Sequence, residues 1–298
     1  MNNLSWMWCG MIGLRFGLAA LGMSLLTAAP VLAQEVPNFS HAEIQAAETN
    51  LNLSVGFMHT NYSEGPPDSE NGFAPGFGVG ASALLPSAFQ NIDLYSALFY
   101  QFNAGNLNYN GHEENLLTQA VTPAQGTDRA VFNRIEGRLG LGFPLANGQV
   151  EIIPYITAGY MSWNRNIDNA GPIGTDEFYR TALVGVGAKV DATVTSSLVL
   201  SASAQFSGLV ASNVTFDSFD EGHTMGDSGD ERVSLGLDQS VSGPLHVFAS
   251  ATVDHFNYAG DKFNDNNIIV AGPYAYQIAE PTSSTTQVGV NLGVSYSF

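Results

Sequence analysis

Apolar and polar residues alternate one by one along ten segments of this chain. The clearest is the C-terminal stretch 287–298, where Gln, Gly, Asn and Ser separate six apolar residues. These six are Val288, Val290, Leu292, Val294, Tyr296 and Phe298. Successive side chains of a β-strand point to opposite faces, so this alternation predicts a strand with one apolar and one polar face.

Nine further segments share the pattern, and each is long enough to supply a strand. They are 51–57, 76–83, 92–102, 134–143, 151–163, 181–190, 198–207, 232–238 and 245–254. The register of 151–163 is ambiguous from the sequence. We favour the register with Ile156 and Tyr160 on the apolar face, because it turns Glu151 to the polar face.

The connections between these segments alternate between long and short. The long ones are 62–72, 104–129, 164–177, 212–231 and 259–285, and the short ones are 86–91, 144–149, 191–197 and 241–244. Asn147-Gly148 and Gly243-Pro244 are typical turn formers in the short ones. Short turns at one end and longer loops at the other are typical of a transmembrane β-barrel.

Composition favours a membrane barrel over a soluble β-sandwich. The chain is 45% hydrophobic and 12% charged, with 32 Gly in 298 residues; the usual charged fraction is roughly 25%. The polar faces carry mostly Gly, Ser, Thr, Asn and Gln, whereas a soluble sheet has a strongly charged outer face. We therefore predict an all-β fold, a transmembrane antiparallel up-and-down barrel of ten strands, with eight or twelve as the alternatives.

The first 33 residues are typical of a signal peptide. Arg15 precedes an apolar core at 16–29, and cleavage after Ala33 leaves a mature start at Gln34. Met11 is an alternative start to Met1. The single cysteine, Cys9, lies in or before this leader, so we expect no disulfide or thiol chemistry in the mature chain. We expect a signal peptide at 1–33, a short periplasmic lead-in at 34–48 and a barrel at 49–298.

The end of the chain resembles the last strand of bacterial outer-membrane β-barrels, which commonly ends in Phe with an aromatic residue two positions earlier. Here these are Phe298 and Tyr296. The stretch Pro154 to Tyr160, PYITAGY, is similar to a PY-x-x-AG-x motif of small porin-like, OmpA/OmpX-type barrels. The resemblance covers about 49–298. It implies a Gram-negative outer-membrane location, with Tyr296 and Phe298 as the signal for barrel assembly.

The same resemblance implies the partners of the chain. These are outer-membrane lipid and lipopolysaccharide, together with periplasmic chaperones and the barrel-assembly machinery during biogenesis. Removal of the leader leaves eight basic residues against 27 acidic ones, a net charge of −19. So strong a negative charge argues against a nucleic-acid partner. We assume a monomer.

Charged residues on the predicted polar faces would point into the barrel. They are Asp93, Arg134, Glu136, Arg138, Glu151, Lys189, Arg232, Asp238 and Asp254. Buried charges must be paired or hydrated, and a barrel of this size is nearly filled by its own side chains. The favoured interpretation is a salt-bridge network that fills the lumen. The alternative is a narrow, cation-leaning, porin-like channel.

The predicted loop 212–231 is strongly acidic. Its carboxylates are Asp217, Asp220, Glu221, Asp227, Asp230 and Glu231, and they accompany His223. Clustered carboxylates can bind Ca²⁺ or Mg²⁺. Their spacing matches no EF-hand loop, so a solvated acidic loop is favoured, and we expect no metal and no cofactor.

The pair Asp220 and His223 resembles, weakly, the Asp-x-His motif of omptins, the ten-stranded outer-membrane proteases. The spacing is one residue too long. The second loop has no aspartate pair and offers only Glu113 and Glu114 beside His112. We therefore expect no enzyme. The leading hypothesis is a structural or surface-interaction role in the cell envelope.

Overall fold

The computed structural model describes most of the chain beyond residue 40. The described residues are 41–65, 68–89, 91–115, 120–168, 175–216, 221–260, 268–271, 274–277 and 280–298. The predicted signal peptide and the first part of the lead-in lie outside this set. Residues from Ser40 onward form one compact unit.

Ten long strands form a closed antiparallel sheet. They are β1 (Asn50–Gly65), β2 (Asp68–Phe89), β3 (Ile92–Asn115), β4 (Ala120–Leu145), β5 (Val150–Asp168), β6 (Thr175–Thr195), β7 (Leu198–Phe216), β9 (Ser228–Ser242), β10 (Leu245–Tyr258) and β13 (Ser283–Ser297). Their order is β6-β5-β4-β3-β2-β1-β13-β10-β9-β7, and β6 pairs with β7 to close the ring. The predicted ten-stranded barrel is confirmed.

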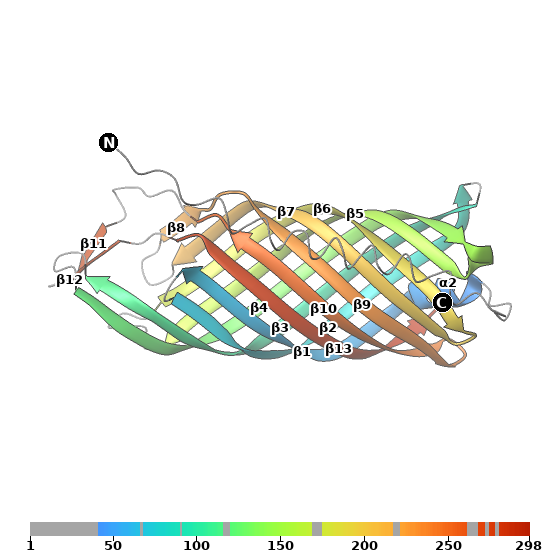
Figure 1. Ribbon diagram of the computed structural model, residues 1–298, viewed down its shortest axis with the longest axis horizontal. Helices are drawn as coiled ribbons and strands as arrows, with labels where there is room; N and C mark the ends of the chain where they lie inside the picture. The colour runs from blue at the N-terminus through green and yellow to red at the C-terminus, as the bar shows by residue number, and fades with distance from the viewer. Residues whose placement is uncertain are drawn as a thin grey trace. The chain divides into compact units, whose positions relative to one another are not determined.

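Three short strands lie beyond the ring at one end of the barrel (Figure 1). β8 (Glu221–Thr224) extends the end of β7, while β11 (Ile268–Ala271) and β12 (Tyr274–Gln277) form a separate hairpin. The C-terminus and the short turns lie at the opposite end. We call the first end the loop end and the second the turn end.

The alternation of the sequence becomes the two faces of the wall. Leu53 pairs with Val294 and Val55 with Leu292 across β1 and β13, so the outward face is continuously apolar. Val55 and Leu292 are 64% and 61% exposed. So broad an exposed apolar surface needs a nonaqueous neighbour, and the lipid-facing band of a membrane barrel is such a surface.

The loops predicted at 62–72 and 104–129 are wrong, because most of their residues are strand. β3 and β4 stay paired as far as Asn115 and Ala120, inside the segment 104–129. Beyond the apolar band a side chain no longer has to be apolar, so alternation disappears from the sequence. The backbone hydrogen bonds between the strands do not depend on it, and the hairpins continue.

The ambiguous strand β5 has the predicted register. Glu151, Ile153 and Tyr155 are buried, whereas Ile156 and Tyr160 are exposed. The Asn147-Gly148 turn before it is also confirmed, since both residues have positive φ, +58° and +85°. Asn and Gly tolerate this left-handed conformation better than other residues.

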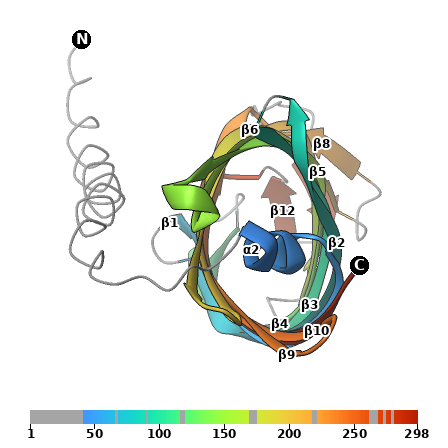
Figure 2. The same cartoon turned by 90° about the vertical axis from the view of Figure 1, so that its right-hand side faces the viewer.

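A helix, α2 (His41–Glu48), lies inside the ring at the turn end (Figure 2). Its buried residues Ile44 and Ala47 belong to an apolar cluster that includes Leu84, Tyr95 and Ile153 from the wall. The second half of the predicted periplasmic lead-in is therefore a plug within the barrel mouth. None of the described helices has the length and apolar character needed to cross a membrane.

Candidate functional site

In the middle of the lumen, the side chain of Arg134 forms ion pairs with residues on the opposite wall of the barrel. It lies on β4, and β10 is five strands away in either direction around the ring. Its guanidinium donates to Asp254 on β10 at 2.9 Å and to both carboxylate oxygens of Asp230 on β9 at 3.0 and 3.1 Å. It also donates to Glu136 at 2.9 and 3.1 Å. One side chain therefore spans the lumen.

Two more arginines complete this central layer. Arg138 donates to Glu136 at 2.7 Å, and Arg232 donates to Asp254 at 2.6 Å. The guanidinium of Arg138 also lies over the Tyr155 ring, 4.7 Å from its centroid. Three guanidinium groups thus face the carboxylates of Glu136, Asp230 and Asp254, so the layer is neutral. A neutral, hydrogen-bonded set is the form in which buried charges are tolerated.

Arg165 centres a second layer toward the loop end. Its guanidinium lies 2.8 Å from Glu64, 2.5 Å from Glu70 and 2.7 Å from Glu177. These carboxylates come from β1, β2 and β6, so the contacts again cross the barrel. Arg165 is itself 3% exposed.

Stacked aromatic rings fill the space beside Arg165. Trp163 stacks on Phe132 at 5.0 Å and on Tyr179 at 5.4 Å, and Tyr179 stacks on Tyr258. Tyr62 meets Trp163 edge-on at 5.0 Å. The five rings come from five different strands, so this layer packs like the interior of a soluble protein.

The Arg165 layer contains more carboxylates than cations. Asp128 and Glu280 are also buried there, in addition to the three partners of Arg165. Glu280 lies just before β13 and accepts a hydrogen bond from Tyr62 at 3.3 Å. Burial, with Glu177 and Glu64 nearby, raises the pKa of the Glu280 carboxyl well above its usual range.

A third set of charges joins α2 to the wall at the turn end. Lys189 on β6 forms ion pairs with Glu48 of α2 and, at 3.3 Å, with Asp191. Burial, with Asp191 nearby, raises the pKa of Glu48 to about 7, and the opposing effect of Lys189 is smaller. The ring nitrogen Nε2 of His41 lies 3.0 Å from both Asp93 and Glu151.

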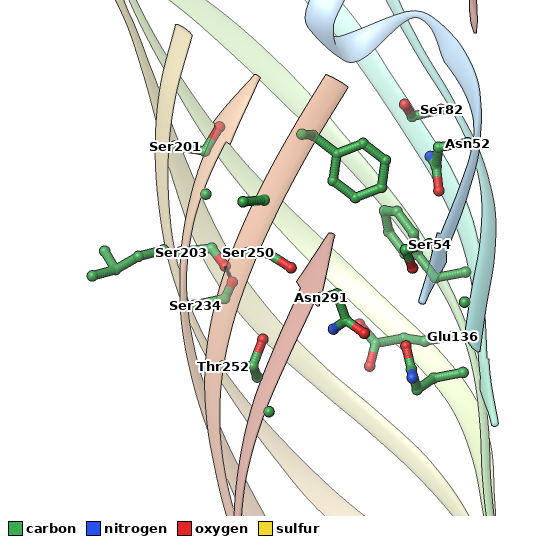
Figure 3. Close-up of a pocket in the computed structure, with 18 of the residues that line it drawn as sticks. Asn52, Ser54, Ser82, Glu136, Ser201, Ser203, Ser234, Ser250, Thr252 and Asn291 are labelled. Atoms are coloured by element: carbon green, nitrogen blue, oxygen red, sulfur yellow. Dashed lines mark hydrogen bonds between the residues drawn. The ribbon is translucent and has the colours of Figure 1, made fainter. Parts of the chain in front are cut away.

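A cavity of about 320 Å³ lies between α2 and the central layer. Its lining includes Ala47 and Glu48 of α2 on one side and Arg134 and Glu136 on the other. Figure 3 shows short polar side chains around it, among them Asn52, Ser54, Ser203, Ser234, Ser250 and Asn291. A smaller cavity of about 50 Å³ lies between the central layer and the aromatic rings.

The inward charges expected from the sequence fall into three groups. Arg134, Glu136, Arg138, Arg232 and Asp254 form the central layer. Asp93, Glu151 and Lys189 contact the plug helix. Asp238 binds His246 at 2.5 Å near the turn end, where Ser295 also donates to it at 3.4 Å.

The residues of the predicted acidic loop lie in different parts of the structure. Asp230 lies in β9 and binds Arg134 in the lumen, so it is part of the wall. Asp227 is exposed in the connection before β9. Asp217 and Asp220 lie outside the described residues, as does the side chain of Glu221.

The two histidines of the protease hypothesis have different surroundings. His112 on β3 lies 3.0 Å from Asp68 on β2. His223 on β8 is buried edge-on against Phe216, with ring centroids 5.4 Å apart. The side chains of Glu113 and Glu114 lie outside the described residues.

Several lumen residues were missed from the sequence, chiefly His41, Glu70, Arg165 and Glu177. Arg165 falls in the segment 164–177, which the sequence predicts to be a loop. The inward positions of β5 are odd-numbered from Glu151 onward, so extending the same parity past residue 163 would have placed Arg165 inside. His41 carried no such signal, because nothing in the sequence places a helix inside a barrel.

Comparison with solved structures finds bacterial outer-membrane proteins. The outer membrane protease OmpT from Escherichia coli has 9% identity and a TM-score of 0.49, covering 84% of this chain and 97% of its own. The translocator domain of the autotransporter NalP from Neisseria meningitidis has 13% identity and a TM-score of 0.39, covering 95% of this chain and 96% of its own. Ail, the attachment invasion locus protein of Yersinia pestis, has 14% identity and a TM-score of 0.30, covering 84% of this chain and 99% of its own.

No protein-family model matches the sequence, and no curated protein does. At such low identity, likeness to solved structures concerns the fold alone. The closed sheet of ten strands and its outward apolar face make this chain a β-barrel of the outer-membrane type.

Proposed function

We propose that this protein is a structural barrel of the bacterial outer membrane, with a closed lumen and a surface-interaction role at its loop end. The observation that carries the proposal is the stack of three layers across the lumen. These are the plug helix α2, the Arg134 layer and the Arg165 layer with its aromatic rings.

The energetics of the layers support a lumen that stays closed. A path for ions through the central layer would have to separate Arg134 from Asp230 and Asp254, which lie across the barrel. Breaking a buried ion pair leaves an uncompensated charge and costs about 3–5 kcal/mol. Three such layers in series make spontaneous opening rare.

Planar-bilayer recording of the refolded chain tests this proposal. We expect no steady conductance from protein whose folding is verified by heat-modifiable migration on a gel. Discrete, long-lived current steps from the same folded protein would contradict the closed lumen.

A narrow cation-leaning conduit is the second candidate, and the 320 Å³ cavity favours it. Hydroxyl and amide groups that can solvate an ion contribute to the lining of the cavity, and α2 lines it on the side of the turn end. Long-lived steps would establish this candidate if they persisted in protein that lacks detectable contaminating porin.

We also propose that the protein has no proteolytic activity. Two contacts support this part of the proposal: His112 pairs with Asp68, and His223 packs edge-on against Phe216, so the two histidines have different surroundings. The folded wild-type chain should leave a library of peptides uncleaved. Cleavage that His223→Ala abolished would overturn this part of the proposal.

The proposed location and partners follow from the outward face. Its apolar band matches a lipid environment, and we propose contacts with lipid and lipopolysaccharide. Tyr296 and Phe298, both on this face, would serve as the assembly signal, and export would use the predicted signal peptide. Membrane fractionation of the wild type and of Phe298→Ser tests this. We expect outer-membrane recovery that the substitution lowers, and recovery of the wild type elsewhere would contradict it.

A further inference from the structure

Three metal-binding side chains meet where the plug helix touches the wall. His41 comes from α2, Asp93 from β3 and Glu151 from β5. The His41 Nε2 atom lies 3.0 Å from Asp93 Oδ2 and 3.0 Å from Glu151 Oε2. The three ligand atoms lie within 4.8 Å of one another. The two carboxylate side chains are 2% and 0% exposed, and the His41 side chain is 22% exposed.

The wall is shaped to bring the two carboxylates together. Between β3 and β5 runs β4, and its Gly142 pairs directly with Asp93. A Cβ at Gly142 would lie 2.1 Å from Glu151 Oε1 and 3.1 Å from Asp93 Cβ. Because Gly142 has no side chain, the carboxylates of Asp93 on β3 and Glu151 on β5 can both approach the imidazole of His41.

Hydrogen bonding leaves two of the four carboxylate oxygens, Asp93 Oδ2 and Glu151 Oε1, without a partner among the described residues. Asp93 Oδ1 accepts from the backbone N–H of Ser87 at 2.7 Å, which fixes the carboxylate. The other oxygen, Asp93 Oδ2, has no hydrogen-bond partner among the described residues, although it points at His41 Nε2. A single Nε2 proton can be donated well to only one of the two acids, and Glu151 accepts it at 3.0 Å. A buried acceptor left without a donor costs about 1–3 kcal/mol.

We propose that His41, Asp93 and Glu151 bind a divalent transition-metal cation such as zinc. A cation in place of the proton satisfies both acids at once. Zinc takes ligands at about 2.0–2.2 Å in a tetrahedron, so neighbouring ligand atoms lie about 3.3 Å apart. The separation of His41 Nε2 from each carboxylate oxygen, 3.0 Å, is close to this value. Three protein ligands and one water complete the tetrahedron.

The identity of the ligands selects the class of metal. An imidazole nitrogen suits zinc and its neighbours in the first transition row, whereas calcium and magnesium prefer oxygen ligands throughout. Gln45, one turn further along α2, lies 3.0 Å from the other ring nitrogen of His41. With its amide turned to present oxygen, Gln45 accepts the Nδ1 proton and orients the ring, as partners of metal-bound histidines do.

A cation bound at this site would hold the plug helix against the wall, because its ligands come from both. A bound cation joins α2 to β3 and β5 in addition to the apolar contacts of Ile44. This inference concerns the turn end alone and does not depend on whether the lumen conducts.

Calorimetric titration of the detergent-folded, chelator-treated chain with Zn²⁺ tests the proposal. We expect one saturable site per chain, and visible absorption bands of tetrahedral Co²⁺ when cobalt replaces zinc. His41→Ala, Asp93→Asn and Glu151→Gln should each weaken zinc binding at least tenfold. Ca²⁺ should give no comparable heat.

A matched control is available at the same end of the barrel. His246 faces a single carboxylate, Asp238, at 2.5 Å. His246→Ala should bind zinc like the wild type. Glu151→Gln keeps the size of the side chain, changes no residue of α2 and retains an oxygen that can accept from His41 Nε2, so it removes the carboxylate with little effect on docking of the plug. Absence of a saturable zinc site in folded wild type, or undiminished binding by His41→Ala and Glu151→Gln, would overturn the proposal.

Discussion

Arg134 is the residue on which most of the cross-wall contacts depend. It holds carboxylates from β4, β9 and β10, and its own side chain is 8% exposed. Glu136 and Asp254 have second partners in Arg138 and Arg232, whereas both oxygens of Asp230 accept from Arg134. The consequence of losing Arg134 should therefore concentrate at Asp230.

We expect Arg134→Ala to lower the free energy of unfolding by about 3–5 kcal/mol, because it leaves a buried carboxylate without its cation. Urea unfolding of the refolded barrel in lipid measures this. Arg129→Ala is the matched control, since Arg129 pairs with Asp168 but its side chain is 65% exposed. Exposed pairs contribute about 0–1 kcal/mol. Equal losses from the two variants would contradict a structural role for the central layer.

Adding Asp230→Asn to Arg134→Ala should restore part of the lost stability. The second substitution removes the charge that the first leaves unpaired, and a neutral amide is less costly to bury than a carboxylate. The comparison is a double-mutant cycle measured by the same urea unfolding. Strictly additive losses from the two substitutions would show that Asp230 and Arg134 do not depend on each other.

At the scale of elements, α2 packs against the wall through Ile44, which is fully buried among wall residues. Ile44→Ala should weaken docking of the helix by about 2–5 kcal/mol, the range for truncating a buried aliphatic side chain. A spin label attached through A42C, at an exposed position of the same helix, reports docking through its mobility. Ala46→Ser, at a half-exposed position, should leave the label as immobile as in the parent. An immobile label in Ile44→Ala would contradict the assigned packing.

Docking of α2 should also depend on pH through Glu48. Its pKa is about 7 when docked and about 4.5 when free, so the docked helix takes up a proton between these values. Docking is then strongest below pH 4.5 and weakens as pH rises through 7, where Glu48 and Asp191 compete for Lys189. With chelator present, the label should be more mobile at pH 8 than at pH 5.5.

Glu48→Gln is the control for this pH dependence. His41 also faces two carboxylates, so the informative quantity is the difference between the wild type and Glu48→Gln. The pH dependence should be smaller in the variant. An identical dependence in both would show that Glu48 does not carry it.

Sequence predicted the elements only where burial imposed a pattern. Residues such as Val186 and Leu292 must face lipid, so alternation marked the strands, their number and the register of β5. Beyond the apolar band, apolar and polar residues no longer alternate at the strand ends around Arg165 and Glu70, so the sequence predicts loops there. The plug helix could not be predicted to enter the barrel, because an eight-residue amphipathic helix fits many surfaces. Contacts such as Arg134 with Asp254 depend on which walls face each other, and that follows from the closure of the whole ring.

At the scale of the whole molecule, the charges of the lumen are distributed unevenly. The central layer is neutral, while the other two have more acids than bases. One guanidinium, Arg165, faces Glu64, Glu70 and Glu177 near buried Asp128 and Glu280. At the turn end, Lys189 faces both Glu48 and Asp191. Any path through this lumen would therefore pass two negative regions.

A barrel opened by substitution should for this reason select cations. We expect Ile44→Asp combined with Arg134→Ala and Trp163→Ala to give current steps in a bilayer, because the three substitutions disrupt the plug contact, the central layer and the aromatic layer together. In a salt gradient the reversal potential should have the sign of a cation-selective pore, since a negatively charged lining raises the local concentration of cations. Adding Glu70→Gln and Glu177→Gln should reduce this preference while steps persist. Anion selectivity, or a preference that ignores the two added substitutions, would show that other groups line the path.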